Sequence, residues 1–66
     1  MRTVTAARIY GHEYDVTVGG AWFATMTIGA DENVEEALTE ELATLDVKVE
    51  GPWRIDADGV RRALAL

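Results

Sequence analysis

One stretch, residues 31–46, constrains the fold more than any other part of the chain. It holds seven of the twelve acidic residues and neither a lysine nor an arginine. At 100° per residue its large apolar residues fall on one narrow stripe, the pattern of a helix that packs on a core along one side. Asp31 is a good N-cap residue, so we expect the helix to begin there. The stripe consists of Val34, Leu38, Leu42 and Leu45.

The rest of this predicted helix surface is strongly acidic. Glu36 and Glu40 point away from the stripe, and Glu35 lies at its margin. Glu32, Glu36 and Glu40 form like-charge pairs at i,i+4, each costing roughly a few tenths of a kcal/mol, and no lysine offsets them. Such a surface suits general solubility, and it also suits docking on the arginines and lysines of a partner. The sequence leaves both explanations open.

Alternation of apolar and polar residues predicts three strands before the helix, over residues 3–10, 13–18 and 21–28. The first strand carries apolar residues on both faces, so either both faces are partly covered or a bulge shifts the phase near Ala6-Ala7. The other two strands alternate cleanly. Their predicted inward residues are Tyr14, Val16, Val18, Trp22, Ala24, Met26 and Ile28.

Gly19-Gly20 joins the second and third strands in a hairpin whose loop length sets the register. A two-residue loop points the two apolar sets to opposite faces, whereas a three-residue loop that includes Ala21 brings them together. We therefore predict the three-residue loop, with a glycine in the left-handed region. The predicted pairs are Val18 with Trp22, Val16 with Ala24, and Tyr14 with Met26.

A further alternating segment, residues 46–56, follows the helix and predicts another strand. Pro52 cannot donate to a ladder, so this strand lies at a sheet edge or is broken at Gly51-Pro52, and we expect a bend there. The predicted inward residues are Val47, Val49, Trp53 and Ile55.

The tail, residues 60–66, fits either a strand or a short helix. The strand is favoured because the Asp-Gly pair before it closes hairpins well and because so short a helix is marginal. As a strand after a four-residue loop, the tail would set Arg62 across from Trp53.

Together these elements predict a single small α+β domain over residues 1–66. Its order is β-β-β-α-β-β with the last strand uncertain, giving a predominantly antiparallel sheet of four to five strands and one helix packed on one face. This order of elements resembles β-grasp domains and the small immunoglobulin-binding modules of bacterial surface proteins, with the first strand as an addition. The resemblance extends to element order alone and implies no function.

Composition argues against several classes of function. The net charge of −6 makes direct nucleic-acid binding unfavourable, and the absence of serine and cysteine removes the two commonest nucleophiles. His12 is the only histidine, and the Asp56-x-Asp58 turn lacks the further ligands of a calcium loop, so we expect no metal and no cofactor. An enzyme that uses His12 is the least favoured alternative. No segment is long and apolar enough to cross a membrane, and the expected location is cytoplasmic.

The aromatic residues offer one further candidate site. Trp22 and Trp53 fall on inward faces and are predicted to be core residues. Phe23 falls on the opposite face, on the side of the sheet that one helix cannot cover, where an aromatic side chain suits a partner. Covering of Phe23 by Ile9 and the tail leucines is an equally good alternative.

The sequence therefore favours a non-enzymatic protein-binding module that docks on a basic protein surface, of which nucleic-acid-binding surfaces are one kind. In size, charge and lack of motifs it resembles small phage-encoded inhibitors, including anti-CRISPR proteins, without matching residues. The alternative is a structural subunit that forms homo-oligomers, a homodimer being the simplest, through a sheet edge or the Phe23 face. The predicted partner-binding residues are Glu32, Glu35, Glu36, Glu40 and Phe23.

Overall fold

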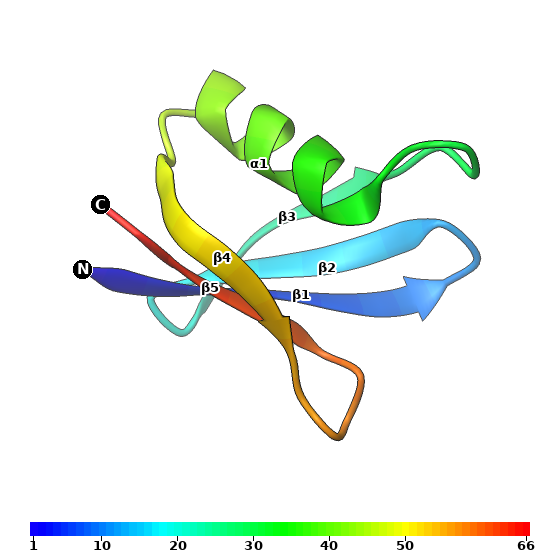
Figure 1. Cartoon of the computed structure of the whole chain (residues 1–66), viewed down its shortest axis with the longest axis horizontal. Helices are drawn as coiled ribbons and strands as arrows, with labels where there is room; N and C mark the ends of the chain where they lie inside the picture. Colours follow the sequence, from blue (N-terminus) through cyan, green and yellow to red (C-terminus); the bar gives the residue numbers. More distant parts are fainter.

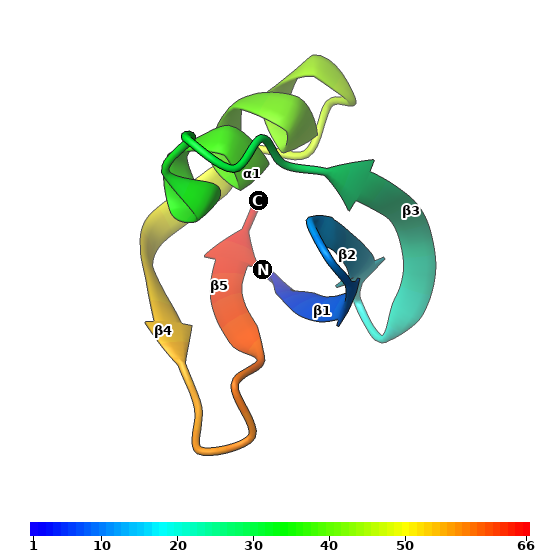
Figure 2. The ribbon, with the colours of Figure 1, turned by 90° about the vertical axis from the view of Figure 1, so that its right-hand side faces the viewer.

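The computed structural model describes residues 1–66 and shows a five-stranded antiparallel sheet with one helix across one face (Figure 1). Neighbouring strands lie in the order β3-β2-β1-β5-β4, so β3 and β4 form the two edges (Figure 2). The predicted α+β class and element order are confirmed. The elements are β1 (Arg2–Tyr10), β2 (Glu13–Val18), β3 (Ala21–Thr27), α1 (Val34–Thr44), β4 (Val49–Ile55) and β5 (Arg61–Ala65).

The core lies between α1 and the sheet face that it covers. Leu38 and Leu42 of the predicted helix stripe are 0% exposed, and Val34 packs at the margin of the core. No polar or charged residue is buried, so the core is wholly apolar. The strands and loops contribute Val4, Ala6, Tyr14, Val16, Met26, Ile28, Val47 and Ala65 to the same cluster.

The helix begins two residues later than predicted. Its N-cap is Asn33, whose side-chain oxygen accepts a hydrogen bond from the Glu36 amide at 3.0 Å. Asp31 lies instead in the preceding turn, in which the Glu32 amide donates to the Gly29 carbonyl at 3.1 Å. Aspartate and asparagine are comparable N-cap residues, so the residue types alone do not decide between the two positions.

The end of the helix corrects the prediction that Leu45 is buried. Leu45 is the C-cap residue and is 48% exposed, because the helix ends at Thr44. The chain then reverses at Asp46, which has a φ of 64°, and Val47 becomes buried next to Leu42 in the core cluster. A helical angle applies only as far as the helix runs, so the stripe is one residue shorter than the pattern suggested.

The β2–β3 hairpin combines the two alternatives for its register. Its loop has two residues, because Val18 pairs with Ala21, and both glycines have positive φ as a type I′ turn requires. A bulge at Phe23 then inserts the extra residue. The predicted pairs Val16–Ala24 and Tyr14–Met26 are confirmed, whereas the predicted Val18–Trp22 pair is wrong because the extra residue is in the strand.

The position of this bulge exchanges the expected places of two aromatic residues. Trp22 pairs with Thr17 and is 66% exposed, so its predicted inward position is wrong. Phe23 is half-buried and packs against the core, so its predicted place on the open face is wrong as well. A one-residue shift turns side chains to the other face of a sheet, and here the bulge confines that inversion to the end of the hairpin.

The first strand is also irregular, though not at the predicted place. Its register against β2 shifts between Arg8 and Tyr10, rather than near Ala6-Ala7. Val4 and Ala6 therefore both point into the core at 0% exposure, and Ile9, the residue without a partner at the shift, is exposed.

The tail forms β5, which pairs with both β1 and β4 and confirms the strand alternative. Its turn has three residues, 57–59, because the Asp56 amide donates to the Val60 carbonyl at 3.1 Å. Arg62 is consequently opposite Arg54 rather than Trp53. Ala63 and Ala65 point into the core, and Leu64 points to the other face.

The predicted features of β4 are confirmed in part. The strand lies at the edge, and its pairing with β5 is interrupted between Glu50 and Arg54, where Gly51 has a φ of 82°. Trp53 packs against the core as predicted, but Ile55 is 56% exposed, since it lies near the tip of the hairpin, away from α1 (Figure 1).

The helix is too short and too polar to span a bilayer.

Candidate protein-binding site

The exposed surface of α1 carries carboxylates that have no cationic partner. Glu36 and Glu40 are both exposed, and neither takes part in an ion pair; the acidic residues that do are Glu35, Asp56 and Asp58. Glu36 lies in the first turn, where the helix dipole favours an acidic residue, but the last turn holds no basic residue to balance Glu40 and its neighbour Glu41. The negative charge of this surface is therefore directed to solvent.

A groove between α1 and β4 brings these carboxylates next to an aromatic wall. Its volume is about 430 Å³. Figure 1 shows β4 running beside the helix on this side. The helix supplies the acidic side of the groove, and the unpaired segment within the β4 interruption supplies the apolar side. The lining residues are Glu35, Glu36, Thr39, Glu40, Pro52 and Trp53.

Hydrogen bonds fix the aromatic wall against the helix. The Trp53 indole N–H donates to the Thr39 hydroxyl at 2.9 Å. The same hydroxyl donates to the Glu35 carbonyl at 2.9 Å, one turn earlier in α1. Thr39 thus satisfies the polar edge of Trp53, so the indole is held in place before any ligand arrives.

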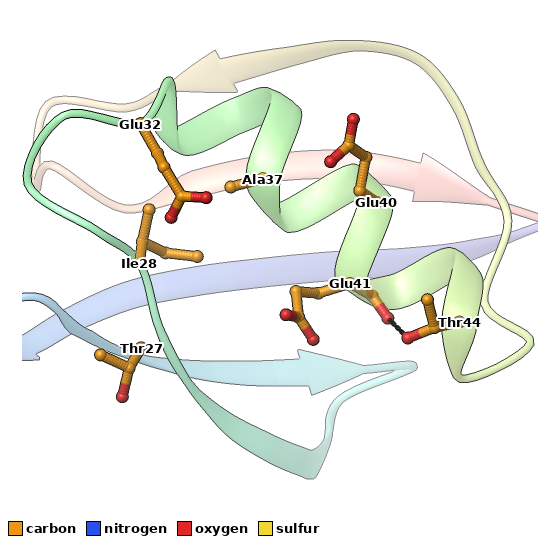
Figure 3. Close-up of a pocket in the computed structure, with 7 residues that line it drawn as sticks. All are labelled: Thr27, Ile28, Glu32, Ala37, Glu40, Glu41 and Thr44. Atoms are coloured by element: carbon orange, nitrogen blue, oxygen red, sulfur yellow. Dashed lines mark hydrogen bonds between the residues drawn. The ribbon is translucent and has the colours of Figure 1, made fainter.

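A second, smaller hollow lies on the other side of the helix, toward β3 (Figure 3). Its volume is about 210 Å³. Glu32, which precedes the helix, also accepts a hydrogen bond from the Gly29 amide at 2.6 Å. Glu40 is the one residue that lines both hollows. The lining residues are Thr27, Ile28, Glu32, Ala37, Glu40, Glu41 and Thr44.

Glu35 differs from the other helix glutamates because a cation faces it. The Arg61 Nε lies 3.5 Å from the Glu35 carboxylate, close enough for an ion pair but without a hydrogen bond. The Arg61 guanidinium also lies 6.0 Å from the centroid of the Tyr14 ring, at the outer limit of a cation–π contact. Glu35 thus joins α1 to β5, while Glu36 and Glu40 have no such internal role.

On the opposite face of the sheet, Trp22 is exposed in place of Phe23. The Trp22 indole N–H lies 3.4 Å from the Asp15 carboxylate, and the Thr25 hydroxyl donates to the same carboxylate at 2.9 Å. The exposure of Trp22 could not be predicted from the sequence, because no residue type marks where the bulge falls. The role of Phe23 in partner binding stays a prediction, now without the open-face position that suggested it.

The remaining polar candidates lie outside the acidic groove. His12 is exposed in the turn between β1 and β2. Asp56 and Asp58 both pair with Arg62, the second at 3.5 Å. No group of three or more metal-ligating side chains is present.

Comparisons of the chain with protein-family models, with curated proteins and with solved structures gave no significant match.

Proposed function

We propose that this protein is a non-enzymatic binding module, a small acidic inhibitor or adaptor that acts in the cytoplasm by occupying a basic surface on another protein. The observation that carries the proposal is the groove between α1 and β4. There two exposed glutamates without cationic partners, Glu36 and Glu40, stand beside the fixed indole of Trp53.

The groove suits an arginine or lysine side chain of the partner. Carboxylates form short, charge-assisted hydrogen bonds with such cations, and with arginine these can be bidentate. The face of an indole attracts the same cation, and the apolar stem of the side chain can lie along Pro52 and Trp53. A single side chain could therefore use both walls of the groove.

The charge of the whole chain supports the same role. Its net charge is −6, and the carboxylates of α1 are concentrated on one side of the molecule. Such a distribution accelerates encounter with a basic surface and helps exclude acidic ones. Basic protein surfaces commonly receive nucleic-acid phosphates, so the acidic surface of α1 would act there as a nucleic-acid mimic, as in small phage-encoded inhibitors of the anti-CRISPR type.

A charge-neutralising double substitution tests this proposal. Wild-type protein captures its partner from the native host, and the affinity of the captured partner is then measured across a range of salt concentrations. Glu36→Gln with Glu40→Gln should weaken binding at least about tenfold, or about 1.4 kcal/mol, and should flatten the salt dependence.

The matched control is Glu13→Gln with Glu50→Gln, which also removes two negative charges, one from β2 and one from β4. If both double variants weaken binding equally, net charge alone is responsible and the groove has no specific role. Unchanged affinity in the Glu36/Glu40 variant would contradict the proposal itself.

A homo-oligomeric subunit is the second candidate, favoured by the exposed apolar residues on the uncovered sheet face. Trp22 and Leu64 are both exposed there, on β3 and β5. Sedimentation at micromolar concentration tests it directly. Self-association that Trp22→Ser abolishes would support an oligomer, and a monomeric wild-type protein would remove this candidate.

A further inference from the structure

The β3 edge of the sheet is unprotected, in contrast to the β4 edge. Residues 21–27 contain no charged residue and no proline. At the other edge, Pro52 and the left-handed Gly51 interrupt the pairing of β4. Natural sheets commonly protect their edges with charges, prolines or bulges, because an open edge accepts another strand. Here the bulge at Phe23 protects only the start of β3, leaving the half that ends at Thr27 regular.

The backbone groups available at this edge can be identified from the β2–β3 register. The Ile28 amide donates to the His12 carbonyl at 2.9 Å, so Ile28 faces β2. Residues of an antiparallel ladder alternate in direction, and thus Met26 also faces β2, whereas Thr25 and Thr27 direct their backbone groups away from it. Both threonines are exposed.

The surroundings of the edge indicate the chemistry of an added strand. The smaller hollow lies beside Thr27 on the helix side, and Figure 3 shows Glu41 extending from α1 toward β3. Glu32 and Glu40 complete its acidic lining. Side chains of an added strand alternate between the two faces, so every second one would meet these carboxylates.

Charge also decides between the possible occupants. A second copy of this chain, paired β3 to β3 about a two-fold axis, would bring its own Glu32, Glu40 and Glu41 toward the same residues of the first copy. An extended segment with lysines or arginines on its helix-facing side has complementary charge instead.

We propose that the β3 edge receives an extended basic segment of the partner protein as a sixth strand, with its cationic side chains in the hollow beneath α1. The proposal rests on the proposed function, since it specifies how the basic partner is held. Backbone hydrogen bonds at Thr25 and Thr27 supply shape recognition, and the three glutamates select positive charge.

Two synthetic peptides test this inference on the wild-type protein. One is a seven-residue peptide of alternating lysine and threonine, and the other has the same sequence with every amide N-methylated, which keeps the charge but prevents ladder pairing. We expect the first peptide to slow amide exchange at Thr25 and Thr27 about tenfold or more and to bind at least about tenfold more tightly than the second.

Two variants locate the effect on the edge. Thr25→Pro removes an outward-facing amide at a position where an edge strand tolerates proline, and it should abolish the difference between the peptides. Both substitutions remove the hydrogen bond from the Thr25 hydroxyl to the Asp15 carboxylate. Thr25→Ala keeps the backbone amide, however, so it should preserve the difference between the peptides. Circular dichroism of each variant checks folding, and the two peptides give a result on the wild-type protein even if one variant unfolds.

Equal binding of the two peptides would overturn the inference while leaving the acidic surface as a binding site. Failure of both peptides to bind at low salt would count against the proposed function too. A wild-type dimer that Thr25→Pro dissociates would show that a second copy occupies the edge, which also overturns the inference.

Discussion

The two edge hairpins of the sheet are stabilised in different ways. In the β2–β3 hairpin, Tyr14, Val16 and Met26 are buried beneath the helix, and β3 itself carries no charge. In the β4–β5 hairpin, Ile55 is exposed and the loop is held by the pairing of Arg62 with Asp56 and Asp58. The first hairpin therefore depends on burial of apolar surface, and the tip of the second depends on charge and hydrogen bonds.

The difference follows from where each hairpin lies relative to α1. The end of β3 leads directly to the loop before the helix and stays under it, whereas the β4–β5 loop lies at the end of the molecule away from the helix (Figures 1 and 2). A chain with one short helix can bury only one region of its sheet. Outside that region, local ion pairs and turn hydrogen bonds must maintain the structure.

Loss of a buried side chain from the β2–β3 hairpin should have the greatest effect on the free energy of unfolding. Met26→Ala removes a side chain that is almost wholly buried and leaves a cavity, so it should reduce the free energy of unfolding by about 2–5 kcal/mol. The equivalent change in the other hairpin, Ile55→Ala, should alter it by no more than about 0.5 kcal/mol. Urea denaturation measures both, and equal losses would contradict the difference between the hairpins.

The two neighbouring aromatic residues of the β2–β3 hairpin should contribute unequally to stability. Phe23→Ala should reduce the free energy of unfolding by about 2 kcal/mol, because the ring packs partly against the core. Trp22→Ala should cost no more than about 0.5 kcal/mol, despite removing the larger side chain. Thermal denaturation of the two variants distinguishes the cases, and a greater loss for Trp22→Ala would place the bulge elsewhere.

A smaller effect concerns the attachment of β4 to the helix. Thr39→Val leaves the Trp53 indole N–H without its acceptor and should reduce the free energy of unfolding by about 1 kcal/mol. It should also change the tryptophan fluorescence. Thr44→Val is the matched control, since its hydroxyl donates only to the exposed Glu41 carbonyl. Equal effects of the two substitutions would show that Trp53 does not depend on Thr39.

The smallest effect is a pH dependence of the β4–β5 loop. The hydrogen bond from the Val60 amide, at 3.0 Å, and the nearby Arg62 hold the pKa of Asp58 below its ordinary value of 3.8. Because the pKa of Asp58 is lower in the folded state, its ionised carboxylate stabilises the folded loop at pH values above the unfolded-state pKa. This stabilisation is lost as the pH falls through the folded-state pKa. The Val60 amide resonance should therefore shift during acid titration with a midpoint below 3.8, and Asp58→Asn should remove that shift.

The secondary structure was largely predictable from the sequence, because alternation and helical spacing are local properties. The faces of Tyr14, Val16 and Met26 and the burial of Leu38 and Leu42 follow from period alone. Bringing the apolar residues of β2 and β3 to one face also required one residue without a partner in the other strand. Whether that residue lay in the loop or in the strand depended on the competition between a type I′ turn at the two glycines and a longer loop, which periodicity does not describe.

The candidate site was predictable to a similar extent. The exposure of Glu36 and Glu40 followed from helical angles. The groove did not, because it depends on the interruption of β4 at Gly51-Pro52 and on the bond that holds Trp53 to Thr39. These are contacts between segments distant in the chain, and a short sequence contains no pattern that identifies them.

The place of β5 in the sheet has a consequence for how the chain folds during synthesis. β5 lies between β1 and β4 and supplies the only strand pairing that connects the first three strands to β4. Its partners in β1 are nearly the whole chain length away, as in the pair of Arg2 with Ala65. On a ribosome, the β1–β2–β3 meander can form early, but the sheet closes only when the last strand has emerged. Until then the nascent chain exposes unpaired edges on both β1 and β3, which is when a chaperone or a second nascent chain can bind it.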